Sequence, residues 1–140
     1  MEAINSHTAG HWDFLWGAAR SQCGSDSCVL ITNPVGHRTQ DQMHIHFRHY
    51  NGAGAALKRR LEGAVCGKRG WRRFSECGSA KARLFSGMPG VFSAVAHAYG
   101  GGSLANVGIT VWFTHGCGGG QKTIVLATTH CSIEHTISAR

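Results

Sequence analysis

Two runs rich in β-branched and aromatic residues, joined by a stretch of glycine, constrain the fold of this chain more than any other feature. The runs are NVGITVWFTH (106–115) and KTIVLATTH (122–130), and their connection, GCGGGQ, contains four glycines. Val, Ile, Thr, Phe and Trp favour pleated strands. Glycine readily adopts the positive φ angles that tight turns require. The pattern therefore predicts an antiparallel hairpin over 106–130.

Other segments predict two more strands and three helices. CVLITN (28–33) is a β-branched apolar run, which favours a strand. Alternating apolar and polar residues predict another strand within TQDQMHIHFRHY (39–50). Helices are predicted over 11–20, where apolar residues recur at helical spacing, over 52–65 and over 90–100.

The size of the chain and the order of these elements predict the fold class. A chain of 140 residues is long enough for one modest core. The basic, irregular segment 66–81 is expected to be an exposed loop. We therefore expect a single α+β domain over 1–140, in which four strands form a mainly antiparallel sheet and the helices pack on one face.

The charge of the chain points to anionic partners. Its formal charge is +7, from 14 Lys and Arg against 7 Asp and Glu. Such a surplus favours partners that carry phosphate, which include nucleotides, anionic lipid surfaces and nucleic acid. The segments LKRRLE and KRGWRRF carry clustered basic side chains, and in the second segment aromatic side chains lie among them. Protein surfaces that bind lipid headgroups or nucleic acid have this composition. A solvated helix face and a basic loop explain them equally well. Membrane-surface contact stays open, and nucleic acid is not the expected partner.

The opening residues and the cysteines bear on location. MEAINSHTAG lacks the basic and apolar regions of a secretory signal, and no run approaches the roughly 18 apolar residues of a membrane span. We therefore expect a cytoplasmic protein whose cysteines are free thiols, with disulfides or a zinc site as the alternatives. The chain has six cysteines, at positions 23, 28, 66, 77, 117 and 131.

The strand predicted within TQDQMHIHFRHY separates into two faces at a period of two. One face is apolar and can pack on a core, and the other is rich in nitrogen donors. The apolar set is Met43, Ile45 and Phe47, and the polar set is His44, His46, Arg48 and Tyr50. Two imidazoles and a guanidinium on one surface suit chemistry on an anion.

Three interpretations of the two imidazoles follow from the residues. A His-x-His pair on a strand can ligate a metal, as in a cupin-like site, but such sites need a further Glu or His nearby. Exposed histidines without a role are the second interpretation. The third is nucleotidyl transfer, in which a neutral imidazole attacks the α-phosphorus and water then releases the nucleotide. Oriented donors must hold the phosphate oxygens in that case.

The spacing around these histidines resembles that of the histidine-triad superfamily. That superfamily carries an Asn on a strand, a glycine-rich turn, and then Gln-Ser-Val-x-His-x-His-x-His, in which the middle His is the nucleophile. Gln40 takes the Gln position here, His44 that of the first His, and His46 that of the nucleophile. Asn33 precedes His46 by thirteen residues (46 − 33), the spacing of that superfamily. Arg48 replaces its third His.

One branch, the CDP-diacylglycerol pyrophosphatase family, resembles the chain more closely. HWDFLWGAAR is similar to its Phe-Trp-x-Ala-Trp-x-Ala-Arg helix, and TTHC to its final strand, which ends in Asp-His-x-Cys. ITNPVGHRTQDQMHIHFR is similar to its strand and loop of the form Ala-x-Asn-Ser-x-x-Gly-Arg-Thr-Gln-Asn-x-Phe-His-Ile-His-Ile-Ser. The block from position 33 to 46 is the specific part of the resemblance.

The resemblance implies a histidine-triad-like fold and a hydrolase that cleaves a phosphoanhydride. His46 would be the nucleophile, His44 would position the phosphate or orient His46, and His130 would be a proton donor or a supporting partner. No metal and no cofactor would be needed, and the partner would be a small, phosphate-bearing substrate. The residues expected to hold the substrate are Asn33, Arg38, Thr39, Gln40, Gln42 and Arg48.

The family normally has a further N-terminal region, whereas this chain begins close to the Trp-containing helix. We therefore expect a shortened member, and a sheet edge that a homodimer covers. Two other functions stay open. One is an acid–base enzyme on a non-nucleotide small molecule, using His44 and His46. The other is a basic binding module without catalysis.

Overall fold

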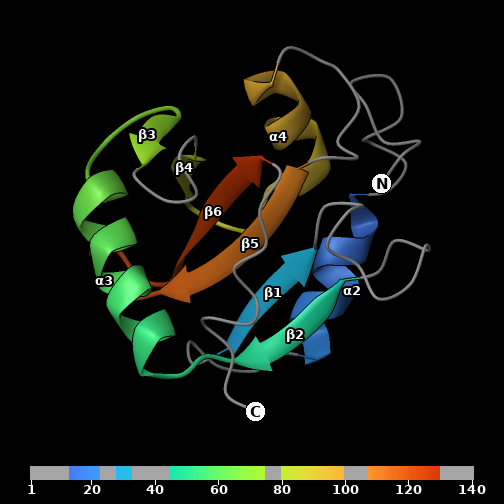
Figure 1. Ribbon diagram of the computed structural model, residues 1–140, viewed down its shortest axis with the longest axis horizontal. Coiled ribbons are helices and arrows are strands. Elements are labelled where there is room, and N and C mark those ends of the chain that lie inside the picture. Colours follow the sequence, from blue (N-terminus) through green and yellow to red (C-terminus); the bar gives the residue numbers. More distant parts are fainter. Residues whose placement is uncertain (1–12, 23–27, 33–44, 75–79, 100–106, 130–140) are drawn as a thin grey trace.

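A six-stranded sheet forms the centre of the molecule (Figure 1). The computed structural model describes residues 13–22, 28–32, 45–74, 80–99 and 107–129. All the paired strands are antiparallel, and the strand order is β2-β1-β5-β6-β4-β3. The strands are β1 (Cys28–Thr32), β2 (His46–His49), β3 (Arg72–Phe74), β4 (Ala80–Phe85), β5 (Val107–Thr114) and β6 (Lys122–Thr129). The α+β class is thereby confirmed.

Helices cover both faces of this sheet, so the prediction that they pack on one face is wrong. The helices are α2 (Phe14–Gln22), α3 (Gly52–Val65) and α4 (Val91–Ala98). Figure 1 shows α3 on one side of the sheet and α2 with α4 on the other. Trp16 of α2 packs edge-on against Phe92 of α4, with 5.3 Å between the ring centroids. These two rings belong to one cluster of buried side chains, here called the α2/α4 cluster. Leu57 and Leu61 of α3 belong to a second cluster, the α3 cluster.

The central strands have the sequence that a two-sided core requires. All five residues of β1 and all eight of β5 are buried. Leu30 packs in the α2/α4 cluster, whereas its neighbours Val29 and Ile31 pack in the α3 cluster. A strand covered on both faces reads as a continuous apolar run, because each side chain enters one core or the other. This is why the strands at 28–33, 106–115 and 122–130 were predictable.

The segment 66–81, predicted to be an exposed loop, instead contains β3 and the start of β4. Ala80 and Ala82 are buried on the α3 side of β4, and Arg72 and Arg73 of β3 are exposed. Alanine, lysine and arginine have little intrinsic preference for strands. The strand forms because β4 pairs with β6 along its whole length, from Ala80 opposite Thr128 to Phe85 opposite Thr123.

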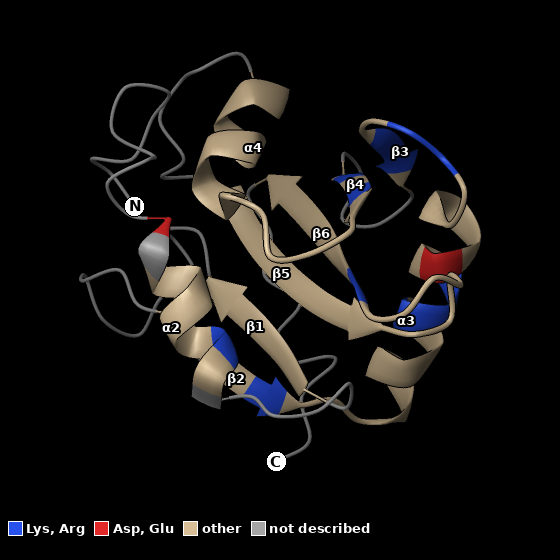
Figure 2. Ribbon diagram, turned by 180° about the vertical axis from the view of Figure 1, so that it is seen from behind, with Lys and Arg blue, Asp and Glu red and all other residues tan. Residues whose placement is uncertain are grey.

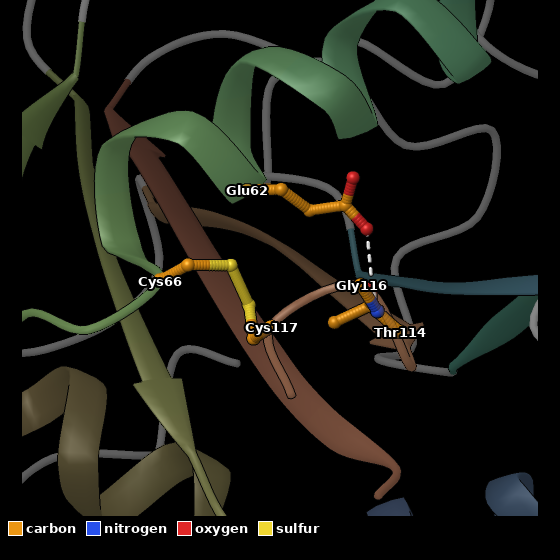
Figure 3. Close-up of a disulfide and its surroundings, with 5 residues drawn as sticks. All are labelled: Glu62, Cys66, Thr114, Gly116 and Cys117. Carbon is orange, nitrogen blue, oxygen red and sulfur yellow. Dashed lines mark hydrogen bonds between the residues drawn. A yellow bond between two sulfur atoms is a disulfide. The ribbon is translucent and has the colours of Figure 1, made fainter. Parts of the chain in front are cut away.

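A disulfide joins the end of α3 to the β5–β6 turn, so the prediction of free thiols is wrong for the described cysteines. It connects Cys66 with Cys117, whose Cα atoms are 5.1 Å apart (Figure 3). Cys28 is disulfide-bonded as well. None of the cysteines among the described residues is free. Disulfides persist mainly in oxidising compartments, so these bonds give no support to the cytoplasmic location, which stays a prediction.

A hydrogen-bonded chain lies beside this disulfide. The Thr114 hydroxyl donates to the Glu62 carboxylate, and the Gly116 N–H donates to the Thr114 oxygen at 2.8 Å (Figure 3). In the turn that follows, Gly118, Gly119 and Gly120 have φ angles of 79°, 74° and 89°. These positive φ angles confirm the prediction that glycine supplies the geometry of the turn.

A carboxylate far away in the sequence caps the start of α4. The N-cap residue, Gly90, has no side chain to bond the first free N–H groups of the helix. Asp13 takes that role: Oδ1 accepts from the Phe92 N–H at 2.7 Å and from the Ser93 N–H at 3.2 Å. Its Oδ2 accepts from the Ser93 hydroxyl at 2.6 Å. The cap ties the residue before α2 to α4.

Candidate functional site

Two of the residues predicted to perform chemistry, His46 and Arg48, lie on β2, which pairs with β1. Residues 33–44 and His130 lie outside the described residues. The predicted residues outside the description are therefore Asn33, Arg38, Thr39, Gln40, Gln42, His44 and His130. Arg48 is described, and His46 is described by its backbone place at the start of β2.

The strand register sets the two strands that flank residues 33–44 beside each other. Ile31 pairs with His46, and Leu30 pairs with Phe47, in antiparallel order. Thr32 ends β1 immediately before the segment, and Ile45 follows it immediately before β2. The strand that leads to the predicted Asn33 thus runs beside the strand that begins at the predicted nucleophile.

The alternation predicted for this strand is confirmed at four described positions, and the burial predicted for one of them is wrong. Ile45 packs against the α2/α4 cluster. Tyr50 packs on the α3 side, where its ring centroid lies 5.5 Å from that of Trp112. Arg48 pairs with Val29 of the α3 cluster and therefore shares that face. Phe47 pairs with Leu30 of the α2/α4 cluster and therefore shares the face of Ile45. Phe47, predicted to pack on the core, is instead 44% exposed, because β2 is the edge of the described sheet.

A lysine that was not predicted from the sequence joins this face of β2. Lys58 of α3 donates from Nζ to the Tyr50 hydroxyl at 3.3 Å, and its Nζ is 5.7 Å from the centre of that ring. The sequence feature that could have predicted this contact is the short connection between β2 and α3. Only Asn51 stands between Tyr50 and the start of α3. Its side chain caps the helix by accepting a hydrogen bond from the Gly54 N–H at 2.9 Å. A helix that starts so close to a strand folds back over it.

Three hydrogen-bond donors therefore lie on the α3 side of β2. They are the guanidinium of Arg48, the phenol of Tyr50 and the ammonium of Lys58, which α3 contributes. Arg48 is partly buried, and its Nη1 lies 3.5 Å from the Phe47 carbonyl oxygen. All three groups can donate hydrogen bonds, and two of them carry positive charge. Such a face can hold the oxygens of a phosphate or carboxylate. The homodimer predicted at the sheet edge stays a prediction.

A pocket lies toward the other edge of the sheet. Its volume is about 430 Å³, and it opens between α4 and β4, next to the residue that precedes β3. Its lining residues are Trp71, Arg83, Ser93, Ala94, His97 and Ala98. Sequence reasoning missed this pocket because Trp71 and the start of β4 were assigned to an irregular loop. The two basic residues of β4, Lys81 and Arg83, at a spacing of two, were the signal that could have placed them on one face of a strand.

Within the described residues, no group of three or more His, Cys, Asp or Glu side chains could hold a metal ion. The described helices also include none that is long and apolar enough to cross a membrane. The first observation does not cover His44 or the side chain of His46, so the predicted mechanism without a metal stays a prediction.

The comparisons with known proteins give no family. No protein-family model, no curated protein and no solved structure matches this chain.

Proposed function

We propose that this protein hydrolyses a phosphoanhydride through a covalent nucleotidyl intermediate on His46. The observation that carries the proposal is the pairing of Ile31 with His46, together with the sequence spacing by which Asn33 precedes His46 by thirteen positions (46 − 33). The pairing sets the strand that leads to Asn33 beside the strand of the nucleophile. The sequence resemblance to the CDP-diacylglycerol pyrophosphatase family rests on the block that begins at Asn33 and ends at His46.

The proposed reaction has two steps. The neutral imidazole of His46 attacks the α-phosphorus, a phosphorus–nitrogen bond forms, and the anhydride oxygen leaves with the second phosphate. Water then attacks the same phosphorus, the phosphorus–nitrogen bond breaks, and the imidazole is regenerated with release of a nucleoside monophosphate. The leaving group is a phosphate anion, which departs without obligatory protonation. CDP-diacylglycerol contains the required bond, and so does a dinucleotide whose halves are joined through a pyrophosphate.

Donors on the α3 face of β2 support the proposal. Negative charge on the phosphoryl oxygens must be balanced in the transition state by groups already in place. Arg48 lies two residues after His46 on the same strand, and Lys58 is held beside Tyr50 by the 3.3 Å hydrogen bond between them. A guanidinium and an ammonium beside the nucleophile's strand would stabilise that charge without a metal.

The test compares two histidines of the same strand. His46→Ala removes the proposed nucleophile, and we expect turnover of a CDP-lipid or a dinucleotide to fall roughly 10³-fold or more. His49→Ala is the control, because His49 is exposed and lies three residues further along β2. Turnover of the control should stay near the wild-type value.

Chelation separates the histidine mechanism from a metal-dependent one. Activity should survive dialysis against EDTA, because no step uses a metal. Activity that is lost on chelation and restored by zinc or manganese would overturn the proposal in favour of the cupin-like interpretation. Equal turnover by wild-type protein and His46→Ala, with the fold intact, would remove His46 as the nucleophile.

A further inference from the structure

The pocket between α4 and β4 combines a helix wall of mostly small side chains with one aromatic and one cationic side chain. Four of its residues come from one face of α4, at positions 93, 94, 97 and 98. Ser93, Ala94 and Ala98 are small, so they leave room between the helix and the strand, while His97 is exposed in the last turn of the helix. The opposite face of α4 is buried in the core, which fixes the position of this wall.

Arg83 lines the pocket without an anionic partner among the described residues. It pairs with Val125 of the α2/α4 cluster, which sets its side chain on the face that α4 covers. The guanidinium carbon lies 4.8 Å from the centre of the Phe85 ring. Arg83 makes no hydrogen bond or ion pair with any described residue, so its five N–H donors are available to a ligand. This contrasts with Lys81 on the same face, whose Nζ donates to the Ala98 carbonyl oxygen at 2.8 Å.

Trp71 forms the aromatic wall of the pocket. Its indole is partly buried and packs edge-on against Phe85, with 6.4 Å between ring centroids. Phe85 therefore supports both the indole and the guanidinium of Arg83, which restricts the orientation of the two groups toward one cavity. An aromatic wall with a few convergent polar groups is the usual composition of a small-molecule site, and 430 Å³ lies within the usual range of volumes.

Basic side chains on the same face of the sheet as the pocket favour anions. Lys81 and Arg83 both lie on the face of β4 that α4 covers, and Arg73 of β3 pairs with Lys81. Figure 2 shows basic residues on β3 and β4. The carboxylate that contacts the pocket lining, Asp13, accepts three hydrogen bonds from Phe92 and Ser93. The negative charge of Asp13 is thus held by hydrogen bonds from the first turn of α4.

This pocket is separate from the proposed active site. Three strands, β1, β5 and β6, lie between β2 and β4. At about 4.8 Å for each step between neighbouring strands, the two sites are about 19 Å apart. A ligand of the pocket therefore need not be the substrate of His46, and its chemistry can be inferred independently of the proposed function.

We propose that the pocket lined by Trp71, Arg83 and His97 binds a small anion with a planar aromatic body. The anionic group would accept a forked pair of hydrogen bonds from the Arg83 guanidinium and a further one from His97. The ring would pack on the indole of Trp71, where stacked or edge-on contacts are favourable. A carboxylate or a phosphate could supply the anionic group, since both match the guanidinium fork.

Isothermal titration with small probes tests this proposal on the full chain. Phenylacetate and phenyl phosphate carry the ring with one or the other anion, whereas benzyl alcohol lacks the charge and inorganic phosphate lacks the ring. We expect at least one of the two aromatic anions to bind at least tenfold more tightly than both incomplete probes. The better of the two identifies the source of the anionic group. Equal binding of benzyl alcohol, or no binding of either aromatic anion, would overturn the proposal.

Charge-matched variants locate the binding. Arg83→Gln should weaken the binding of the better aromatic anion tenfold or more, and Trp71→Leu should weaken it too. Arg72→Gln removes the same charge from an exposed position of the neighbouring strand and should leave affinity within about twofold. His97→Asn, at an exposed helix position, gives a second variant if Arg83→Gln does not fold. Equal losses in Arg72→Gln and Arg83→Gln would show that general charge, and not the pocket, holds the anion.

Discussion

Tyr99 is a residue whose ionisation is linked to folding. It follows α4, and its hydroxyl donates to the Ala127 carbonyl oxygen of β6 at 3.3 Å. The Nζ atom of Lys81 is 4.9 Å from the centre of its ring. Burial raises the pKa of Tyr99 above its ordinary value of 10.0, because removal from water disfavours the phenolate. The folded state therefore holds the phenol proton more tightly than the unfolded chain does.

This shift predicts a pH dependence of stability above pH 10. The contribution of neutral Tyr99 is fully present below the unfolded pKa, and it is lost as the pH rises toward the folded pKa. At neutral pH, Tyr99→Phe should destabilise the protein by about 1 kcal/mol, because a hydrogen bond to Ala127 is lost. The difference in unfolding free energy between the two proteins should shrink above pH 10. Urea titrations at about pH 7 and about pH 10.5 measure it, and a constant difference would contradict this assignment.

At the residue scale, the sequence predicted which face of a strand a side chain lies on better than it predicted which residue of another element that side chain contacts. Ile45 and Tyr50 occupy opposite faces of their strand, as the period of two requires. Lys58 was not predicted at the site, because its contact with Tyr50 depends on how α3 folds back over β2. The roles of His44 and His46 in chemistry stay predictions.

Helix α4 depends on a carboxylate that lies outside the element. Its own N-cap, Gly90, cannot bond the free N–H groups, and Asp13 does so from a separate part of the chain. A Cβ atom added at Gly90 would come within 2.7 Å of Asp13 Oδ2. The glycine is therefore needed for the approach of the carboxylate, and not for its backbone angle, since φ is −72°.

A double-mutant cycle tests this cap. Asp13→Ala should cost about 1–2 kcal/mol of unfolding free energy, the usual cost of losing a helix cap. Gly90→Ala should also destabilise the wild-type protein, because it displaces the carboxylate. In the Asp13→Ala background the same change at Gly90 should cost clearly less. Thermal or urea unfolding of the four proteins gives the coupling energy, and strictly additive costs would contradict the predicted contact.

Element boundaries were predictable where the local pattern and the tertiary environment agree. The helix predicted over 52–65 is α3, and the hairpin of β5 and β6 lies within one residue of its predicted bounds. The strands β3 and β4 were missed because their side chains favour solvent or helix, and because their stability comes from the pairing of β4 with β6. No local signal reports a pairing between segments so far apart in the sequence.

At the scale of the whole molecule, the Cys66–Cys117 disulfide closes a long covalent loop. The two cysteines are separated by 51 residues, and the bond ties α3 to the β5–β6 turn. It therefore encloses β3, β4, α4 and β5. Cysteine spacing alone could not predict the partner, because the chain has six cysteines with several possible pairings.

Loss of this bond should destabilise the whole domain. For a loop of 51 residues, the loss of chain entropy in the unfolded state corresponds to a stabilisation of about 4 kcal/mol. A Cys66→Ala/Cys117→Ala variant should lose stability of that order in urea titrations. Glu62→Gln, which keeps the disulfide and alters the neighbouring hydrogen bond to Thr114, is the control and should lose less. Wild-type stability in the double variant would show that the bond does not constrain the fold.

The central claim, that His46 becomes covalently bonded to a nucleotide, is tested most directly by mass spectrometry of the protein during turnover. Trypsin releases the peptide TQDQMHIHFR (39–48), which contains both histidines of the motif. After a rapid quench in base, in which a phosphoramidate survives, we expect a nucleoside monophosphate on this peptide, with fragmentation placing it on His46. The adduct should disappear on acid treatment and in His46→Ala, and persist in His49→Ala. Turnover of a phosphoanhydride with no adduct on His46, and at the same rate in His46→Ala, would contradict the account.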